Sequence, residues 1–170
     1  MKKKLVFLTG TRADFGKIKS LIKISLTDPN FEVHIFVTGM HVHKKYGYTV
    51  KEIEKSGFNN IHTYKNFNKE EGMDEILANT IHGFTKHIKM INPDMIVVHG
   101  DRVEALACST VGALNHILTA HVEGGEVSGT IDDSIRHAIT KLSHIHFIGS
   151  TSAKKRVSNM GEDIKNIYKI

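Results

Sequence analysis

Six short apolar runs recur along the chain and are separated by longer segments with helical periodicity. This alternation is typical of a parallel β-sheet with helices on both faces, because parallel neighbours need a crossover between them. Residues 95–98 are continuously apolar, and Pro93 and Gly100 bracket them, as expected for a central strand buried on both sides. We therefore predict an α/β fold with a Rossmann-like parallel sheet and helices on both faces. The expected elements are strands at residues 4–10, 31–39, 60–64, 94–100, 116–122 and 144–149, a long helix over residues 70–91, and the start of another strand within 161–170.

Glycine and polar residues follow four of the expected strands at the point where each strand ends. They occupy residues 10–14, 39–43, 100–102 and 123–129. In open α/β sheets, ligands bind beyond the carboxyl ends of the strands, and these ends meet at one edge of the sheet. The sequence therefore predicts a single site at this edge, to which all four loops contribute.

Residues 121–147 bring carboxylates, histidines, arginine and glycine together where a strand is expected to pass through a loop into a helix. Glu123 ends the strand, and Asp132 with Asp133 stands where a helix N-cap belongs. In one interpretation one of the aspartates only caps the helix, and Arg136 forms an ion pair with it at helical spacing. Glu123 favours a functional site instead, because a carboxylate at the end of a strand has no capping role.

The composition, 40% hydrophobic and 24% charged over 170 residues, predicts one domain with a real hydrophobic core. The net charge is +5, and the lysines are scattered without interleaved aromatic residues, so we expect solvated surface and no nucleic acid partner. No apolar run is long enough to span a bilayer, and residues 1–4 lead straight into the first strand, without a secretory signal. We expect a cytoplasmic protein with no membrane partner. The single cysteine, Cys108, is expected to be a small buried residue.

Residues 10–17, GTRADFGK, resemble a phosphate-binding loop, but their glycine spacing and the residue after the lysine differ from a P-loop. The GxGxxG pattern of dinucleotide-binding proteins is also absent, so we expect no cofactor. What remains is a glycine turn that opens a helix, with Arg12 near the helix N-terminus, where amide donors and a guanidinium both favour anions. We predict a diphosphate site at Arg12. The alternative is a surface ion pair between Arg12 and Asp14.

His99 and His121 occupy equivalent places at the ends of two expected strands. They are expected to contribute to the substrate site by orienting carboxylates or tuning their protonation, and the alternative is two satisfied core histidines. Two further pairs have a spacing that zinc ligands could use, namely His41 with His43 in a loop and His144 with His146 on an expected strand. We expect no metal, because no cysteine joins these pairs.

Four blocks of the sequence, in this order, resemble the hydrolysing UDP-N-acetylglucosamine 2-epimerases of sialic acid biosynthesis. They are residues 10–17, residues 41–58 (HVHKKYGYTVKEIEKSGF), residues 98–107 (VHGDRVEALA) and residues 121–147. The resemblance implies one half of a GT-B-type enzyme, in which residues 1–170 form the amino-terminal Rossmann-like domain and a carboxy-terminal nucleotide-binding domain lies outside the chain. It also implies a UDP-sugar substrate held between the two domains, and a homodimer. We therefore expect this chain alone to fold but to turn over little or no substrate.

The resemblance also implies roles for individual residues. We expect Asp101, Glu123 and Asp132 to be the catalytic carboxylates, although Asp101 could also be a plain helix N-cap. The expected residues for substrate or nucleotide binding are Arg12, Arg102, Asp133, Arg136, His99 and His121. In the implied reaction, UDP leaves C1 of the sugar while the C2 proton is removed, giving a 2-acetamidoglucal. Water then adds at C1 and a proton returns to the opposite face of C2, work suited to converging carboxylates.

Other functions remain open at this point. A non-hydrolysing 2-epimerase would return UDP to C1, but the forms of residues 121–129 and 131–137 resemble the hydrolysing branch, and Met40 stands where the other branch typically has glutamine. A hydrolysing epimerase for 2,4-diacetamido sugars would use the same residues. A GT-B glycosyltransferase would keep the architecture without the carboxylate set. A nucleotide-sugar-binding half-domain would bind without turnover.

Overall fold

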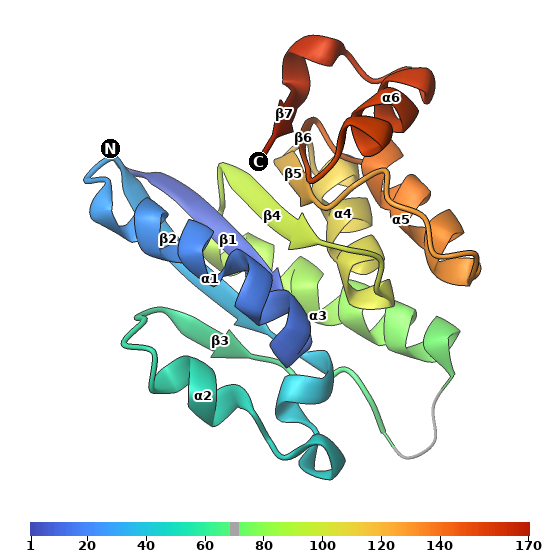
Figure 1. The fold of residues 1–170 in the computed structure, drawn as a ribbon. Coiled ribbons are helices and arrows are strands. Elements are labelled where there is room, and N and C mark those ends of the chain that lie inside the picture. The colour runs from blue at the N-terminus through green and yellow to red at the C-terminus, as the bar shows by residue number, and fades with distance from the viewer. Residues whose placement is uncertain (69–71) are drawn as a thin grey trace.

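The computed structural model describes residues 1–68 and 72–170. Within them, seven parallel strands form one sheet in the order β3-β2-β1-β4-β5-β6-β7 (Figure 1). The strands are β1 (Lys3–Thr9), β2 (Phe31–Val37), β3 (Ile61–Thr63), β4 (Met95–His99), β5 (Leu118–Val122), β6 (Ile145–Ile148) and β7 (Ile167–Lys169). The α-helices are α1 (Arg12–Thr27), α2 (Val50–Glu54), α3 (Met73–Ile91), α4 (Val103–Leu114), α5 (Ile131–Lys141) and α6 (Thr151–Asn159). The expected Rossmann-like fold is confirmed.

The strand order reverses direction between β1 and β4. From β1 the chain moves outward through β2 to β3, and from β4 it moves outward the other way through β5 and β6 to β7. β1 pairs with β2 along its whole length and with β4 through residues 5–7. Ligands in such sheets bind at this reversal, beyond the carboxyl ends of the strands. The fold therefore places the expected site beside β1 and β4.

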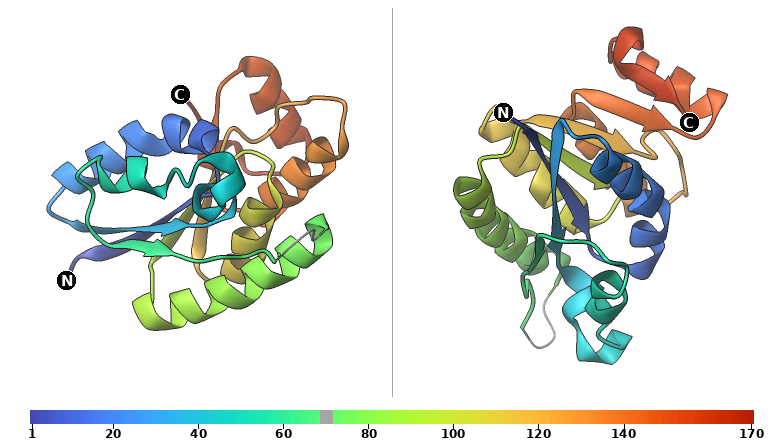
Figure 2. Two further views of the ribbon diagram at one scale, coloured as in Figure 1. Left: turned by 90° about the horizontal axis from the view of Figure 1, so that it is seen from below. Right: turned by 90° about the vertical axis from the view of Figure 1, so that its left-hand side faces the viewer.

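Alternate residues of the central strands face two hydrophobic cores, as the period of two in a strand requires. On one face α1 and α2 cover the sheet, and on the other α3, α4 and α5 cover it; Figure 2 shows α1 and α3 on opposite sides. The first core includes Phe7, Phe15, Ile18, Ile35 and Ile53, and the second includes Val6, Phe84, Ile96, Cys108 and Ile139. Cys108 is fully buried, as expected.

A third, smaller core joins α6 to β6 and β7 through Ile148, Ala153, Val157 and Ile167. The loop after β5 passes close to α6 at Gly125, whose φ is +77°. A Cβ at Gly125 would lie 2.6 Å from Val157 Cγ2, so only glycine allows this approach. Within the described parts of the chain, no helix is long and apolar enough to cross a membrane.

Two expected elements differ from the structure. The long helix begins at Met73 in the described residues, and Glu70 and Glu71, where we expected it to start, lie outside them. His144 precedes β6 and does not belong to it: its Nδ1 accepts the backbone N–H of Thr119 at 3.2 Å. The expectation that His144 and His146 both belong to this strand is therefore wrong.

Candidate active site

The end of β4 and the turn that follows it contribute one side chain to each of three groups at the carboxyl edge of the sheet. His99, the last residue of β4, lies beside Glu123. Asp101 belongs to an ion-pair cluster, and Arg102 lines a cavity. Because β4 adjoins the reversal in strand order, these groups occupy the part of the fold where a ligand is expected.

Glu123 follows β5 directly and has a left-handed backbone conformation, with φ of +62°. Lys17 Nζ lies 2.8 Å from its Oε1, and His99 Nε2 lies 3.1 Å from its Oε2. Burial would raise the pKa of Glu123, but the hydrogen bond from Lys17 and the proximity of His99 outweigh it, so the pKa is lowered. A left-handed conformation costs a residue with a Cβ about 1–2 kcal/mol, and such strain is typical of functional sites.

This arrangement makes Glu123 a candidate proton acceptor. Its lowered pKa keeps the carboxylate ionised at neutral pH, while burial lowers the pKa of His99 and leaves that ring neutral. The Glu123 side chain is 36% exposed, so a ligand can reach it. We expected Lys17 to be solvated surface, because no sequence signal links the first turns of α1 to the end of β5.

A second group joins Asp101, Asp133 and Arg136, three residues that we expected in the site. Arg136 is buried; its Nη2 pairs with Asp101 Oδ2, and its Nη1 lies 3.4 Å from Asp133 Oδ1. Asp133 also accepts hydrogen bonds from the backbone N–H groups of Gly129 at 2.8 Å and Ser128 at 2.6 Å. These bonds, that from Gly129 foremost, lower the pKa of Asp133. Asp133 thus shapes the loop before α5, and Arg136 neutralises Asp101.

The helix caps differ from the expected ones. Thr130 is the N-cap of α5: its Oγ1 accepts the backbone N–H of Asp132 at 3.2 Å and donates to the Asp132 carboxylate at 3.0 Å. Asp132 and Asp133 therefore lie in the first turn, where carboxylates also favour the helix dipole. Asp101 is not the N-cap of α4, because Arg102 occupies that position. The plain-cap interpretation of Asp101 is wrong.

The three expected catalytic carboxylates lie at the same edge but have separate partners. In the described residues Glu123 pairs with Lys17 and His99, Asp101 pairs with Arg136, and Asp132 bonds with Thr130. From the sequence we expected these carboxylates to converge. The structure instead holds each carboxylate in its own surroundings, which is the arrangement needed for acid and base groups that act on different atoms.

His121 is a structural residue. It is fully buried, its Nε2 lies 2.8 Å from the carbonyl oxygen of Gly100, and its Nδ1 lies 3.1 Å from Thr140 Oγ1. Burial lowers the pKa of His121 to about 3, so the ring is neutral. Because both ring nitrogens are engaged within the protein, the expected contact of His121 with substrate is corrected: it ties the turn after β4 to α5.

Arg12 lies at the start of α1, and the two amide groups of the turn before it already have a partner. Asp14 is buried and accepts the backbone N–H groups of Gly10 at 3.0 Å and Thr11 at 2.9 Å. The amides of Gly10 and Thr11 are therefore not free to bind an anion, contrary to what we expected of this glycine turn. The alternative Arg12–Asp14 pair is also wrong, since Arg12 Nη1 lies 3.5 Å from Glu52 Oε1. The Arg12 side chain is 68% exposed and can reach a ligand.

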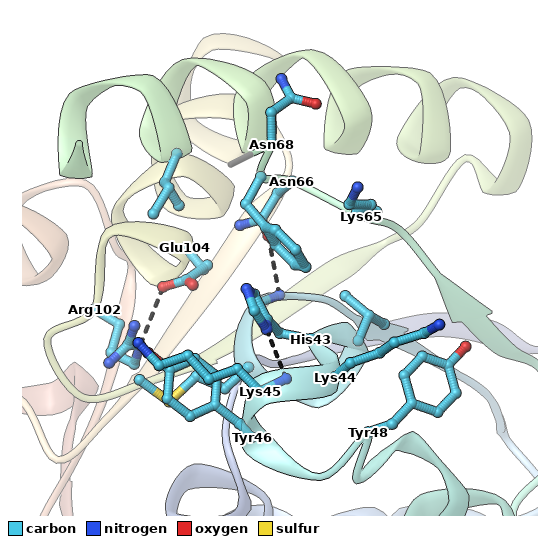
Figure 3. A pocket seen from close by; sticks show the side chains of 15 residues that line it. His43, Lys44, Lys45, Tyr46, Tyr48, Lys65, Asn66, Asn68, Arg102 and Glu104 are labelled. Atoms are coloured by element: carbon cyan, nitrogen blue, oxygen red, sulfur yellow. Dashed lines mark hydrogen bonds and ion pairs between the residues drawn. The ribbon is translucent and has the colours of Figure 1, made fainter. Parts of the chain in front are cut away.

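A cavity of about 840 Å³ has Arg102 in its lining, whereas Glu123, Asp101 and Asp132 are not among the residues that line it (Figure 3). Its walls come from the loop after β2, the segment after β3 and the start of α4. Cationic side chains gather in it, namely Lys44, Lys45, Lys65 and Arg102. Its aromatic wall includes His43 stacked on Phe67, with ring centroids 4.3 Å apart. Positive charge beside stacked rings suits an anionic ligand that carries a ring.

Glu104 lines the cavity and was not among the residues that we expected in the site. It is 2% exposed, and its Oε2 lies 3.2 Å from Arg102 Nε. A carboxylate within the otherwise apolar run from Val103 to Cys108 was the signal that could have found it.

The histidines that have the spacing of zinc ligands bond to other groups of the protein. His41 is fully buried between two hydroxyl groups, with Nε2 3.0 Å from Thr9 Oγ1 and Nδ1 2.7 Å from Thr49 Oγ1. In residues 1–68 and 72–170, no group of three or more histidine, cysteine, aspartate or glutamate side chains is placed to hold a metal ion.

Comparison with known proteins identifies the family to which the chain is similar. The family model described as UDP-N-acetylglucosamine 2-epimerase matches residues 25–170. The chain is 47% identical to a UDP-N-acetylglucosamine 2-epimerase of Neisseria meningitidis serogroup B, over 98% of this chain and 44% of that protein. It is 36% identical to a hydrolysing UDP-N,N'-diacetylbacillosamine 2-epimerase of Legionella pneumophila, over 100% of this chain and 46% of that protein.

The fold matches as well. The structure of a UDP-GlcNAc 2-epimerase from Methanocaldococcus jannaschii superposes with a TM-score of 0.84 at 23% identity, over 98% of this chain and 45% of that one. The chain thus spans less than half the length of the relatives it matches. Both the family model and the identities above 30% over nearly the whole chain lead to one conclusion. The chain belongs to the UDP-N-acetylglucosamine 2-epimerase family.

Proposed function

We propose that this chain is the amino-terminal domain of a hydrolysing 2-epimerase that converts UDP-N-acetylglucosamine and water into UDP and N-acetylmannosamine. The observation that carries the proposal is Glu123, an ionised carboxylate held between Lys17 and His99 at the edge where strand order reverses. A second domain, which the length of the relatives suggests, would form the opposite wall of the site. Without that wall the chain alone would bind weakly and turn over little or no substrate.

The relatives support both parts of this proposal. The Neisseria relative, at 47% identity, is named for UDP-N-acetylglucosamine, which favours that sugar. The Legionella relative, at 36% identity, is named as hydrolysing, which favours release of the sugar from UDP. Its substrate, a 2,4-diacetamido sugar, is the second candidate for this chain.

The proposed mechanism uses the carboxylates as general acid and base. Glu123 takes the proton from C2 while the C1–oxygen bond breaks and the electron pair leaves with UDP, which produces a C1–C2 double bond. Water then adds its hydroxyl group to C1, and C2 receives a proton on the opposite face. Asp101 and Asp132 are the two candidates to supply that proton. No change in oxidation state occurs, so the reaction needs no nicotinamide.

Two arginines are proposed to bind the diphosphate. Arg12 at the start of α1 and Arg102 at the start of α4 both have partly exposed guanidinium groups at the same edge of the sheet. A planar guanidinium can donate two parallel hydrogen bonds to phosphate oxygens. Arg136 serves differently, since it neutralises the Asp101 carboxylate.

The test is product analysis with the whole protein. UDP-N-acetylglucosamine and its 2,4-diacetamido analogue are supplied in parallel, and the products are followed by mass spectrometry and proton NMR. We expect UDP and free N-acetylmannosamine to form faster than the products of the analogue. Faster turnover of the analogue would reassign the sugar, and an epimerised sugar still attached to UDP would place the protein in the non-hydrolysing branch. UDP binding without any turnover would leave only a binding function.

A further inference from the structure

Glu104 is a buried carboxylate that the proposed mechanism does not use. It lies in the first turn of α4, on the wall of the cavity (Figure 3). An ionised carboxylate buried without a partner is strongly unfavourable, so its position requires an explanation.

The surroundings fix the Glu104 carboxylate in one place. Gly39, with φ of +59°, packs against it so closely that a Cβ there would lie 2.6 Å from Glu104 Oε1. A Cβ at Gly10 would lie 3.6 Å from Glu104 Cδ. The turns after β1 and β2 therefore pack against the Glu104 side chain and leave no room for it to move toward them.

Glu104 pairs with Arg102 through the Nε atom of the guanidinium group. Arg102 Nε lies 3.2 Å from Glu104 Oε2, and the Arg102 side chain is 39% exposed. No hydrogen bond or ion pair is made by Arg102 Nη1 or Nη2 in the part of the chain that the structure describes. Because a guanidinium is planar, fixing Nε also fixes the direction in which the two terminal NH2 groups donate.

We infer that Glu104 is a positioning residue for Arg102. It holds Arg102 by Nε, so that the terminal NH2 groups are presented as a ready-made fork to the diphosphate of the nucleotide sugar. This inference rests on the proposed function, since that proposal gives the cavity edge its diphosphate ligand. The gain is in affinity, because the flexible arginine side chain is ordered before the ligand binds.

A double-mutant cycle on UDP binding tests the inference. UDP is titrated calorimetrically into the whole protein carrying Glu104→Gln, Arg102→Ala, both changes or neither. Glu104→Gln should raise the Kd about fivefold to tenfold, because the charge-assisted bond to Nε is weakened. In the Arg102→Ala background the same change should alter the Kd less than about twofold, since nothing is left to position. Equal losses in both backgrounds would overturn the inference.

The matched control is Glu162→Gln, which removes another largely buried carboxylate with a cationic partner, Lys141. Glu162 follows α6, away from the cavity, and the control should leave the Kd unchanged. A second variant keeps the test decisive if Glu104→Gln folds poorly. Arg102→Lys should bind UDP about as weakly as Arg102→Ala, because one ammonium cannot serve both Glu104 and the diphosphate. Near-parental binding by Arg102→Lys would overturn the inference.

Steady-state kinetics separate positioning from chemistry. Glu104→Gln should raise KM by the same factor as the Kd and leave kcat within about twofold, because the lost contact serves binding. A fall in kcat with unchanged KM would contradict a positioning role. The proposed function is tested separately, by the identity of the product. A different product would refute that function and would not change the result of the UDP titrations.

Discussion

Replacing Arg136 with methionine would remove the charge that neutralises Asp101 while keeping an unbranched side chain. The side chains of Arg136 and Asp101 are 11% and 26% exposed, so the pair lies between two known extremes. Exposed pairs contribute about 0–1 kcal/mol, and removing one partner of a fully buried pair costs about 3–5 kcal/mol. The substitution affects Asp133 less than Asp101, because the backbone N–H groups of Ser128 and Gly129 still donate hydrogen bonds to Asp133. We expect a loss of about 2 kcal/mol, equivalent to a fall in Tm of about 4–8 °C.

Urea unfolding followed by circular dichroism measures this loss. Arg136→Met combined with Asp101→Asn should recover about half of it, because the unpaired charge is removed. Lys141→Met is the control: that lysine is 53% exposed in its pair with Glu162, and its loss should cost less than about 1 kcal/mol. If the free energy of unfolding of Arg136→Met lies within about 0.5 kcal/mol of that of the parent, the ion-pair cluster does not stabilise this edge.

Three further changes test other parts of the structure. Gly39→Ala should cost about 2–3 kcal/mol in urea unfolding, because its φ is +59° and the new Cβ would meet Glu104; unchanged stability would show that the turn relaxes. Burial lowers the pKa of His87 from 6.5 to about 4, so between these values the unfolded chain binds a proton that the native state does not, and stability falls on acidification by at most about 1.4 kcal/mol per pH unit. His87→Phe should flatten that decline, and an equally steep decline would refute the argument. Arg12→Lys should weaken UDP binding by the whole protein roughly tenfold, and unchanged affinity in a titration would remove Arg12 from the site.

The sheet could be predicted because local patterns determine it. Continuous apolar runs such as residues 95–98 predicted buried strands, and the glycine and polar residues after each strand predicted the edge at which Glu123, Asp101 and Arg102 lie. These features depend on residues that are close together in the sequence.

The pairings within the site could not be predicted, because they join residues far apart in the chain. Lys17 reaches Glu123 across 106 positions, and Arg136 reaches Asp101 across 35. Small competitions between neighbours were also missed. Thr130 is the N-cap of α5, where we expected an aspartate. Asp14 accepts the backbone N–H groups of Gly10 and Thr11, which we expected to bind phosphate. The periodicity of a sequence indicates neither contacts between distant residues nor which of several neighbouring side chains bonds to a backbone group.

The most direct test of the proposed chemistry is the fate of the C2 hydrogen. The whole protein is supplied with UDP-N-acetylglucosamine in deuterated water, and the products are analysed by proton NMR and mass spectrometry. Elimination and re-addition predict UDP and free N-acetylmannosamine with one deuterium at C2. Glu123→Gln should lower this turnover by about two orders of magnitude, the usual scale for a lost general base. A product that keeps its original C2 hydrogen would contradict the account.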